Sequence, residues 1–295
     1  MLWRGRSRPL YNPKPFESDV KADWCPGCGD FGVLAALKDA LTTLKLEPHQ
    51  VVIVSGIGCS SNIPGYIRTF GFHGLHGRPI PVAVGIKDAN PKLTVIAAAG
   101  DGDEYGIGFN HVVHAARRND DVKLIVMNNE IYGLTTGQLS PTSKLGQRTK
   151  TTPDGSIIYP LKPLSTLLGA GATFVSRGFT GDPKHLSWLI QEAVRHRGFA
   201  LVDAISPCVT WHNIYDEVRK MVYKLEDRGY RPDDEGAAYR AINDETGIPI
   251  GIFYRTEAKA TFQEMVSVVN GGRWPAESVR GLTAQEAEEV MRPYL

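Results

Sequence analysis

Two polar motifs at a fixed separation could bind a phosphorylated cofactor together with a metal ion. Gly100-Asp101-Gly102 is separated from Asn128-Asn129 by residues 103–127. The glycines let backbone amides approach a diphosphate closely, and the Asp101 carboxylate can hold a hard cation that bridges phosphate oxygens. The Asn129 side-chain oxygen can supply a further ligand to magnesium. Either motif alone is more often an ordinary turn, but the pair at this spacing predicts a diphosphate and magnesium site.

The four cysteines are the second group of residues that could do chemistry. Cys25 and Cys28 lie in Trp-Cys-Pro-Gly-Cys-Gly, a tight turn that brings two thiols together, and Cys59 and Cys208 follow two predicted strands. In a cytoplasmic chain, cysteines are more plausible as metal ligands or reactive thiols than as disulfides. Lone cysteines are also often small core residues. If all four converge, they could hold zinc or an iron–sulfur cluster.

Short apolar runs that alternate with helical patterns would position these motifs. Four runs have the composition of strands buried on both faces of a parallel sheet, and they are residues 51–54, 93–99, 122–127 and 200–206. Three segments repeat apolar residues at helical spacing, and they are residues 31–45, 109–118 and 185–196. The alternation predicts an α/β fold with a doubly wound, mostly parallel sheet. In such sheets ligands bind outside the carboxyl ends of the strands, where each polar motif lies.

We expect three parts in the chain. Residues 1–15 form an irregular arm rich in Arg and Pro, residues 16–215 form the cofactor-binding domain, and residues 216–295 form a C-terminal extension. The apolar run Ile248 to Tyr254 contains Pro and Gly, which favours an extended or edge segment over a central strand. As exposed apolar surface, it would be a candidate contact with another subunit.

The bulk composition narrows the class of protein. The 295 residues are 42% hydrophobic and carry a net charge of +1, which is typical of a globular protein and gives no basic footprint for nucleic acid. No apolar run approaches the roughly 20 residues that cross a bilayer. The N-terminus lacks the apolar core of a secretory signal, so we expect a cytoplasmic protein without a membrane partner. A nicotinamide-binding fold is not favoured, because Gly102, Gly106 and Gly108 have the wrong spacing for Gly-x-Gly-x-x-Gly.

The paired Gly-Asp-Gly and Asn-Asn motifs resemble those of thiamine-diphosphate enzymes. The metal ligands of that superfamily are the motif Asp, the second Asn and a main-chain carbonyl two residues on. Carried over to this chain, they are Asp101, Asn129 and Ile131. The resemblance therefore implies thiamine diphosphate and Mg²⁺ as cofactors.

Longer motifs resemble the β subunit of two-subunit archaeal and bacterial 2-oxoacid:ferredoxin oxidoreductases. In order, they are Trp24–Gly29, Gly56–Ser61, Phe72–Arg78, Gly100–Asp103, His114–Asn119, Ile131–Gln138 and Ser206–Cys208. The likeness covers most of the first 215 residues. It implies that Cys25, Cys28, Cys59 and Cys208 hold one [4Fe–4S] cluster.

The activity implied by this resemblance is oxidative decarboxylation of a 2-oxoacid with coenzyme A, yielding acyl-CoA and CO₂. Electrons would pass from thiamine diphosphate through the cluster to ferredoxin. Thiamine activation requires a glutamate from a pyrimidine-binding domain for which this chain has no room, so we expect an α subunit that supplies it and handles coenzyme A.

The expected site residues follow from the same motifs. Those expected to be catalytic are His76, Arg78 and Leu134. Those expected to bind cofactor are Ile57, Gly58, Cys59, Ser60, His73, Gly85, Lys87, Gly100, Asp101, Gly102, Asp103, Asn129, Ile131, Tyr132, Gly133, Leu134 and Thr135. Cationic and donor groups at positions 73–78 and 87 suit a 2-oxoacid carboxylate, although solvated turn residues are the alternative.

Two departures from the family leave the substrate open. Several relatives carry lysine where this chain has Asn62 and Thr136, so pyruvate, 2-oxoglutarate and branched or aromatic 2-oxoacids are all compatible.

Two other functions compete with the oxidoreductase. One is a non-redox thiamine decarboxylase or synthase with structural zinc, and the other is a non-catalytic, zinc-stabilised scaffold subunit.

Overall fold

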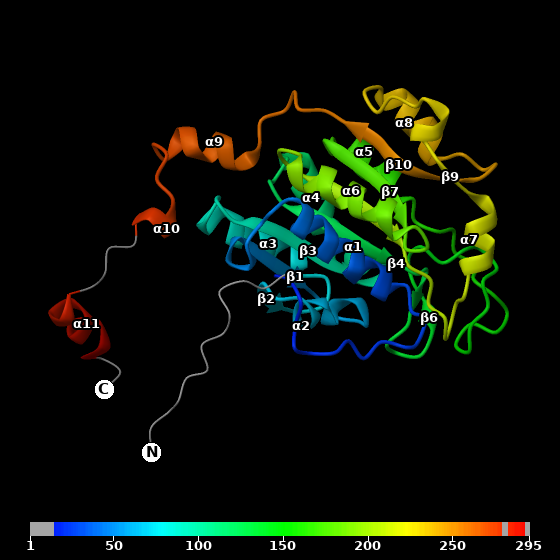
Figure 1. The fold of residues 1–295 in the computed structure, drawn as a ribbon, viewed down its shortest axis with the longest axis horizontal. Coiled ribbons are helices and arrows are strands. Elements are labelled where there is room, and N and C mark those ends of the chain that lie inside the picture. Colours follow the sequence, from blue (N-terminus) through cyan, green and yellow to red (C-terminus); the bar gives the residue numbers. More distant parts are fainter. Residues whose placement is uncertain (1–14, 279–282, 293–295) are drawn as a thin grey trace, which may run out of the picture.

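An eight-stranded, mostly parallel sheet forms the centre of the molecule (Figure 1). The computed structural model describes residues 15–278 and 283–292, so the predicted N-terminal arm lies almost wholly outside the described residues. The strand order is β2-β1-β3-β4-β8-β7-β10-β9. The strands are β1 (Val51–Ser55), β2 (Phe70–His73), β3 (Thr94–Gly100), β4 (Lys123–Asn128), β7 (Phe174–Phe179), β8 (Ala200–Ile205), β9 (Val222–Lys224) and β10 (Ile248–Arg255). The β5–β6 hairpin lies outside this sheet and pairs Ile131–Tyr132 with Gln138–Leu139.

Helices cover both faces of the sheet, as the alternating pattern predicts. One face packs against α1 and α6, and the other packs against α3, α4, α5 and α8. The long helices are α1 (Asp30–Thr43), α3 (Pro79–Ala89), α4 (Phe109–Arg118) and α6 (Pro183–Arg195). The shorter ones are α2 (Ile63–Tyr66), α5 (Pro163–Gly169), α7 (Tyr215–Met221), α8 (Glu235–Ile242), α9 (Phe262–Val269), α10 (Pro275–Ser278) and α11 (Ala284–Met291), with η1 (Pro48–Gln50), η2 (Ser60–Asn62), η3 (Gly102–Ile107) and η4 (Glu226–Arg228). The predicted doubly wound α/β fold is confirmed.

Four adjacent parallel strands bring the polar motifs to one edge. β1, β3, β4 and β8 are neighbours in the sheet and run parallel to one another. Cys59 follows β1, Asp101 follows β3, Asn129 follows β4 and Cys208 follows β8. Their carboxyl ends therefore meet at the same edge, which is the place where such sheets bind ligands.

The run Ile248 to Tyr254 is not the exposed segment that its composition suggests. It forms most of β10, which pairs antiparallel with β7 and parallel with β9. Ile250, Ile252 and Phe253 are buried within the chain itself. The expectation of an edge segment is therefore wrong, because three-residue β9 takes the edge, whereas the expected subunit contact of residues 216–295 stays a prediction. The proposed division of the chain at residues 215 and 216 stays a prediction.

Among residues 15–278 and 283–292, each helix is too short or too polar to cross a lipid bilayer.

Candidate functional site

A cavity of about 240 Å³ opens at the carboxyl ends of β1, β3 and β4. All of its lining residues belong to the set that the sequence predicts. They are Ile57, Gly58, Cys59, Ser60, His76, Gly100, Asp101, Gly102, Asp103, Asn129, Ile131, Tyr132, Gly133, Leu134 and Thr135. Four segments far apart in the sequence thus form one site, which we call the diphosphate cavity.

Asp101 is the central acid of this cavity and is 1% exposed. Its Oδ2 atom accepts hydrogen bonds from Ser140 Oγ at 2.6 Å and from Thr142 Oγ1 at 2.5 Å. Burial raises the pKa of this carboxyl to about 6, despite both hydrogen bonds. A bound cation would favour the ionised form, which suits a metal ligand.

Asn129 and Ile131 border the same cavity through a tight turn. Asn129 Oδ1 accepts a hydrogen bond from the Ile131 amide at 3.0 Å, and Glu130 between them has a φ of +58°. Together with Asp101, this turn offers a carboxylate, an amide oxygen and a backbone carbonyl. These are the oxygen donors that magnesium prefers, so the donor set fits the expected ion.

Asp103 ties together three segments of the cavity wall. Its Oδ1 accepts a hydrogen bond from the Gly77 amide at 2.6 Å and lies 2.5 Å from His76 Nδ1. Its Oδ2 accepts one from the Ile57 amide at 3.3 Å. A Cβ atom at Gly56 would collide with this carboxylate, so glycine is required for its close approach. Asp103 therefore fixes the orientation of the His76 ring at the cavity.

Tyr132 packs against the glycine that follows Asp101. Its hydroxyl donates a hydrogen bond to the Gly102 carbonyl at 3.0 Å, and a Cβ atom at Gly102 would collide with the tyrosine ring. The second glycine of Gly-Asp-Gly is thus needed for contact between η3 and the β5–β6 hairpin.

Four expected site residues lie outside this cavity. His73 Nδ1 is 2.8 Å from the Ser61 carbonyl, and Arg78 Nη1 is 3.1 Å from His111 Nε2. Gly85 and Lys87 lie on α3, and Lys87 pairs at 2.7 Å with Asp121, just before β4.

The placement of Gly85 and Lys87 at the cofactor is therefore corrected. Lys87 reaches the amino end of β4, whereas the diphosphate cavity lies at the carboxyl end of that strand. Its ammonium is neutralised by Asp121 and also donates to the Leu93 carbonyl at 2.9 Å. The side chain cannot serve both this pair and a substrate carboxylate.

The four cysteines line a second cavity of about 200 Å³, which we call the cysteine cavity. Cys28 N donates to the Cys25 carbonyl at 2.9 Å, which closes the predicted turn. Trp24 Nε1 donates to the Cys59 carbonyl at 2.6 Å and holds that loop beside the turn. The other lining residues are Asp23, Asp30, Asn62, Asn129, Gly133, Leu134, Val209, Thr210 and Trp211. The predicted convergence of four thiols is present.

The cysteine cavity disfavours free thiolates. Burial, with the nearby Asp30 carboxylate, raises the pKa of the Cys28 thiol well above its usual range and that of Cys59 to about 11. Thiolates here would need a positively charged partner. In the part of the chain that the structure describes, no three His, Cys, Asp or Glu side chains are arranged to hold a single metal ion.

The two cavities share a wall. Cys59, Asn129, Gly133 and Leu134 line both of them. A cofactor in the diphosphate cavity would therefore be a close neighbour of any group held by the cysteines.

Comparison with known proteins agrees with this geometry. Residues 49–204 match the family model "Thiamine pyrophosphate enzyme, C-terminal TPP binding domain", and residues 208–271 match the model for the C-terminal part of the pyruvate ferredoxin oxidoreductase beta subunit. The 2-oxoacid:ferredoxin oxidoreductase subunit beta of Saccharolobus solfataricus is 46% identical over 83% of this chain and 85% of its own length. This chain belongs to the 2-oxoacid:ferredoxin oxidoreductase β-subunit family. It is thus one chain of a multi-subunit oxidoreductase, with an α subunit as partner and a thiamine diphosphate domain.

Two further relatives extend the likeness of this β subunit. The 2-oxoglutarate synthase subunit KorB of Methanocaldococcus jannaschii is 41% identical over 67% of this chain and 73% of its own length. A solved structure of 2-oxoglutarate:ferredoxin oxidoreductase from Magnetococcus marinus, with 2-oxoglutarate, coenzyme A and succinyl-CoA bound, superposes with a TM-score of 0.84 at 37% identity. It covers 96% of both chains.

Several polar residues that support the cavities of the β subunit were not predicted from the sequence. Ser140 and Thr142 hold Asp101, and Thr142 Oγ1 also lies 3.1 Å from Asn128 Oδ1. Asp30 accepts a hydrogen bond from Ser206 Oγ at 2.6 Å beneath the cysteine cavity. The nearest signal in the sequence is the hydroxyl cluster Ser140-Pro-Thr142-Ser143, which an ordinary turn explains equally well.

Proposed function

We propose that this β subunit binds thiamine diphosphate and Mg²⁺ in the diphosphate cavity and a [4Fe–4S] cluster in the cysteine cavity. With its α subunit and coenzyme A, it would convert a 2-oxoacid to acyl-CoA and CO₂ and pass the electrons to ferredoxin. The observation that carries this proposal is the wall shared by the two cavities. A redox centre beside a decarboxylating cofactor is useful in an oxidative reaction and has no role in a non-oxidative one.

The residues of the diphosphate cavity fit their proposed cofactor. Asp101, Asn129 and the Ile131 carbonyl would hold the metal, while the glycines leave backbone amides open to the diphosphate. When bound, thiamine diphosphate supplies a nucleophile for the 2-oxo carbon and an electron sink for decarboxylation. Leu134 gives an apolar wall that is shared with the cysteine cavity.

His76 is the proposed proton-handling residue of this chain. Its Nδ1 faces the Asp103 carboxylate, which favours the tautomer with a proton on Nδ1 and leaves Nε2 able to accept one. The ring is about one third exposed and lies at the cavity, where it can reach a bound substrate. Arg78, two residues further along the chain, would attract the substrate carboxylate.

We favour an iron–sulfur cluster over zinc in the cysteine cavity. All four cysteines border this cavity, and four thiolates can hold either group. Zinc has no redox chemistry, whereas a [4Fe–4S] cluster can accept electrons from a cofactor across the shared wall.

The substrate class of this chain is a 2-oxoacid, and 2-oxoglutarate is the first to test. The name of the Magnetococcus marinus structure includes 2-oxoglutarate and succinyl-CoA, and several relatives are named for 2-oxoglutarate. Asn62 lines the cysteine cavity, and Thr136 lies in the turn after Leu134, so both departures from the family are near the site.

The metal content of the co-expressed α–β complex tests this function. Purified without oxygen, the complex should be brown, contain about four irons per β chain and lose its visible absorption on reduction. Replacing Cys208 by Ser should remove most of that iron. A colourless complex with stoichiometric zinc would support the non-redox alternative instead.

A further inference from the structure

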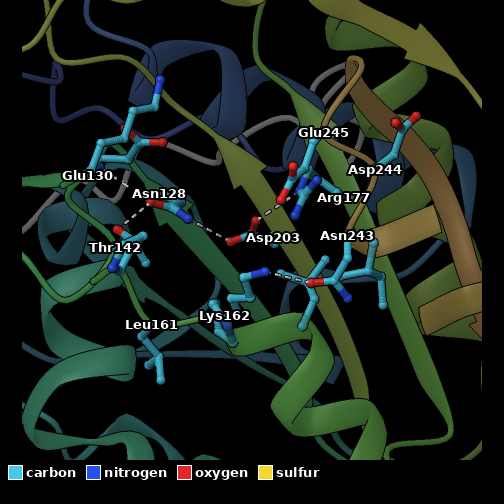
Figure 2. Close-up of a pocket in the computed structure, with 15 residues that line it drawn as sticks. Asn128, Glu130, Thr142, Leu161, Lys162, Arg177, Asp203, Asn243, Asp244 and Glu245 are labelled. Atoms are coloured by element: carbon cyan, nitrogen blue, oxygen red, sulfur yellow. Dashed lines mark hydrogen bonds and ion pairs between the residues drawn. The ribbon is translucent and has the colours of Figure 1, made fainter. Parts of the chain in front are cut away.

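A third cavity, of about 430 Å³, lies next to the diphosphate cavity, and Thr142 of its wall donates a hydrogen bond to Asp101 (Figure 2). It shares no lining residue with either of them. Its wall consists of Asn128, Glu130, Thr142, Lys144, Pro160, Leu161, Lys162, Pro163, Leu164, Arg177, Asp203, Ile242, Asn243, Asp244 and Glu245. The proposed reaction makes no use of this space.

Two charged residues form its floor at positions where a sheet normally carries apolar side chains. Arg177 of β7 and Asp203 of β8 are cross-strand partners, and their neighbours Val175 and Leu201 lie in the hydrophobic core. Asp203 is 2% exposed and the Arg177 side chain is 18% exposed. Burying a charged pair costs more free energy than filling the same space with apolar side chains, so the stability of the fold does not explain why the pair is there.

The carboxylate of this pair is already satisfied. Asp203 Oδ1 accepts hydrogen bonds from Tyr105 Oη at 3.0 Å and from Asn128 Nδ2 at 3.2 Å. Its Oδ2 lies 3.5 Å from Arg177 Nε. Figure 2 shows Asn128, Asp203 and Arg177 as one row along the cavity. Asp203 thus orients Arg177 rather than offering a free anion.

The guanidinium of Arg177 keeps donors to spare. It lies 5.4 Å from the centre of the Phe253 ring, which fixes its plane. Its ion pair with Asp203 is formed at Nε, and within residues 15–278 and 283–292 its two terminal nitrogens donate no hydrogen bond. A held guanidinium with two open N–H edges is suited to bidentate binding of a carboxylate or phosphate.

The other charges at the cavity are of both signs. Glu130 lies 3.3 Å from His212 Nε2, Lys144 pairs with Glu217, and the Asp244 carboxylate accepts hydrogen bonds from the neutral hydroxyls of Tyr223 and Thr246 and stays negative. Lys162 forms no ion pair among the described residues and donates to Asn243 Oδ1 at 3.1 Å, so its ammonium adds positive charge at the rim. Glu245 is exposed at the mouth.

We propose that this cavity is a second ligand site, which binds a small oxyanion, a carboxylate or a phosphate, through Arg177 on its floor and Lys162 at its rim. The anion forms two parallel hydrogen bonds to the guanidinium, and Asp203 holds that guanidinium in place. The site is separate from the one that binds the 2-oxoacid, and the proposal stands whether or not the cysteines hold iron.

Calorimetric titration of the co-expressed α–β complex with succinate and with inorganic phosphate tests the site. Neither probe has a 2-oxo group, so neither is turned over. We expect saturable binding of at least one probe, and the tighter of the two identifies carboxylate or phosphate as the natural chemistry. Arg177→Met should weaken that binding at least tenfold, and Lys162→Met should weaken it less.

Two controls separate this site from others. Arg228→Met removes an exposed guanidinium that lies over Tyr223 and should leave probe affinity unchanged. Arg78→Met should also leave it unchanged, because Arg78 lies beside the diphosphate cavity. Lys162 is exposed, so Lys162→Met keeps the test open if Arg177→Met does not fold. The proposal would be overturned if neither probe binds, or if wild type, Arg177→Met and Lys162→Met bind the probe with equal affinity. It would also be overturned if only Arg78→Met loses probe binding.

Discussion

The Thr142 hydroxyl lies between the Asp101 carboxylate of the diphosphate cavity and the side-chain amide of Asn128, the last residue of β4. Thr142 Oγ1 is 2.5 Å from Asp101 Oδ2 and 3.1 Å from Asn128 Oδ1. A hydrogen bond to a charged group is worth about 1.5–3 kcal/mol. Thr142 therefore contributes to the orientation of a proposed metal ligand without touching the metal.

Replacing Thr142 by Val keeps the shape of the side chain and removes its hydrogen bond to Asp101. We expect magnesium-dependent binding of thiamine diphosphate to the α–β complex to weaken by roughly tenfold, consistent with the loss of one charge-assisted hydrogen bond. Calorimetry on Thr142→Val measures this. Thr151→Val, at an exposed threonine, is the matched control and should bind as wild type does. Unchanged affinity in Thr142→Val would show that Asp101 needs no such support.

His196 predicts a pH dependence of stability. It is 1% exposed, its Nε2 lies 2.8 Å from Thr173 Oγ1, and burial lowers its pKa to about 3. In the unfolded chain the pKa is about 6.5, so below that pH the unfolded state binds more protons than the folded state. The stability that neutral His196 provides is thus present above about pH 6.5 and is lost as the pH falls toward 3.

Thermal unfolding of the complex at pH 7.5 and pH 5 tests this expectation. Wild type should lose more of its melting temperature on acidification than His196→Gln, which cannot be protonated. His49→Gln, at an exposed histidine, should keep the wild-type response. Equal losses in wild type and His196→Gln would mean that other groups set the acid sensitivity.

Among single residues, those that could be predicted from the sequence are the ones with few alternative uses. Gly-Asp-Gly with Asn-Asn, and a Cys-x-x-Cys turn with two further cysteines after strands, are seldom combined outside a cofactor site, and the structure gathers them. Ser140 and Thr142 could not be assigned, since hydroxyls in a Ser-Pro-Thr-Ser segment also suit any turn. Lys87 was misplaced because a charge alone does not show to which end of a strand it points.

At the scale of elements, β10 changes the account of the C-terminal region. Its residues 249–253 are buried between β7 and β9, and Phe253 is fully buried against the face covered by α5 and α8. Residues after 215 thus complete the main sheet instead of lying outside it. The sequence obscured this because Pro249 and Gly251 are uncommon in central strands.

Truncating Phe253 measures how far β10 belongs to the core. Phe253→Ala should lower the free energy of unfolding by about 3–5 kcal/mol, as expected for a large buried aromatic. Ile157→Ala, at a side chain that is 91% exposed, should change it by about 0.5 kcal/mol or less. Denaturant unfolding of both variants gives the comparison. A small effect at Phe253 would restore the view of this segment as a detachable extension.

Whether the other strands could be predicted from the sequence depended on how continuous their apolar pattern is. The strands at 51–55, 94–100, 123–128 and 200–205 were predictable because they are continuous apolar runs. β7 was missed because Ser176, Arg177 and Gly178 interrupt its pattern, and two of these three serve the floor of the third cavity or the close packing of α6. β2 was missed because all four of its side chains are exposed.

At the scale of the whole molecule, we predict that this chain is inactive by itself. The family model that matches residues 49–204 is a C-terminal thiamine-binding domain, and we expect the pyrimidine-binding domain to belong to the α subunit. The isolated β chain, supplied with thiamine diphosphate, Mg²⁺ and coenzyme A, should reduce no viologen dye with any 2-oxoacid. Adding the α subunit should restore dye reduction, and a panel of 2-oxoacids would rank the substrates. Full activity from the isolated chain would refute the two-subunit site.

The central claim is that electrons released in the diphosphate cavity enter a cluster held by the four cysteines of the same chain. Stopped-flow absorption of the anaerobic α–β complex, mixed with coenzyme A and its best 2-oxoacid in the absence of ferredoxin, follows this transfer within one turnover. We predict that the visible absorption of the cluster bleaches in wild type. In Asp101→Ala the 2-oxoacid should cause no bleaching, although dithionite still bleaches the cluster. A wild-type complex that releases CO₂ while its visible absorption stays constant would contradict the account.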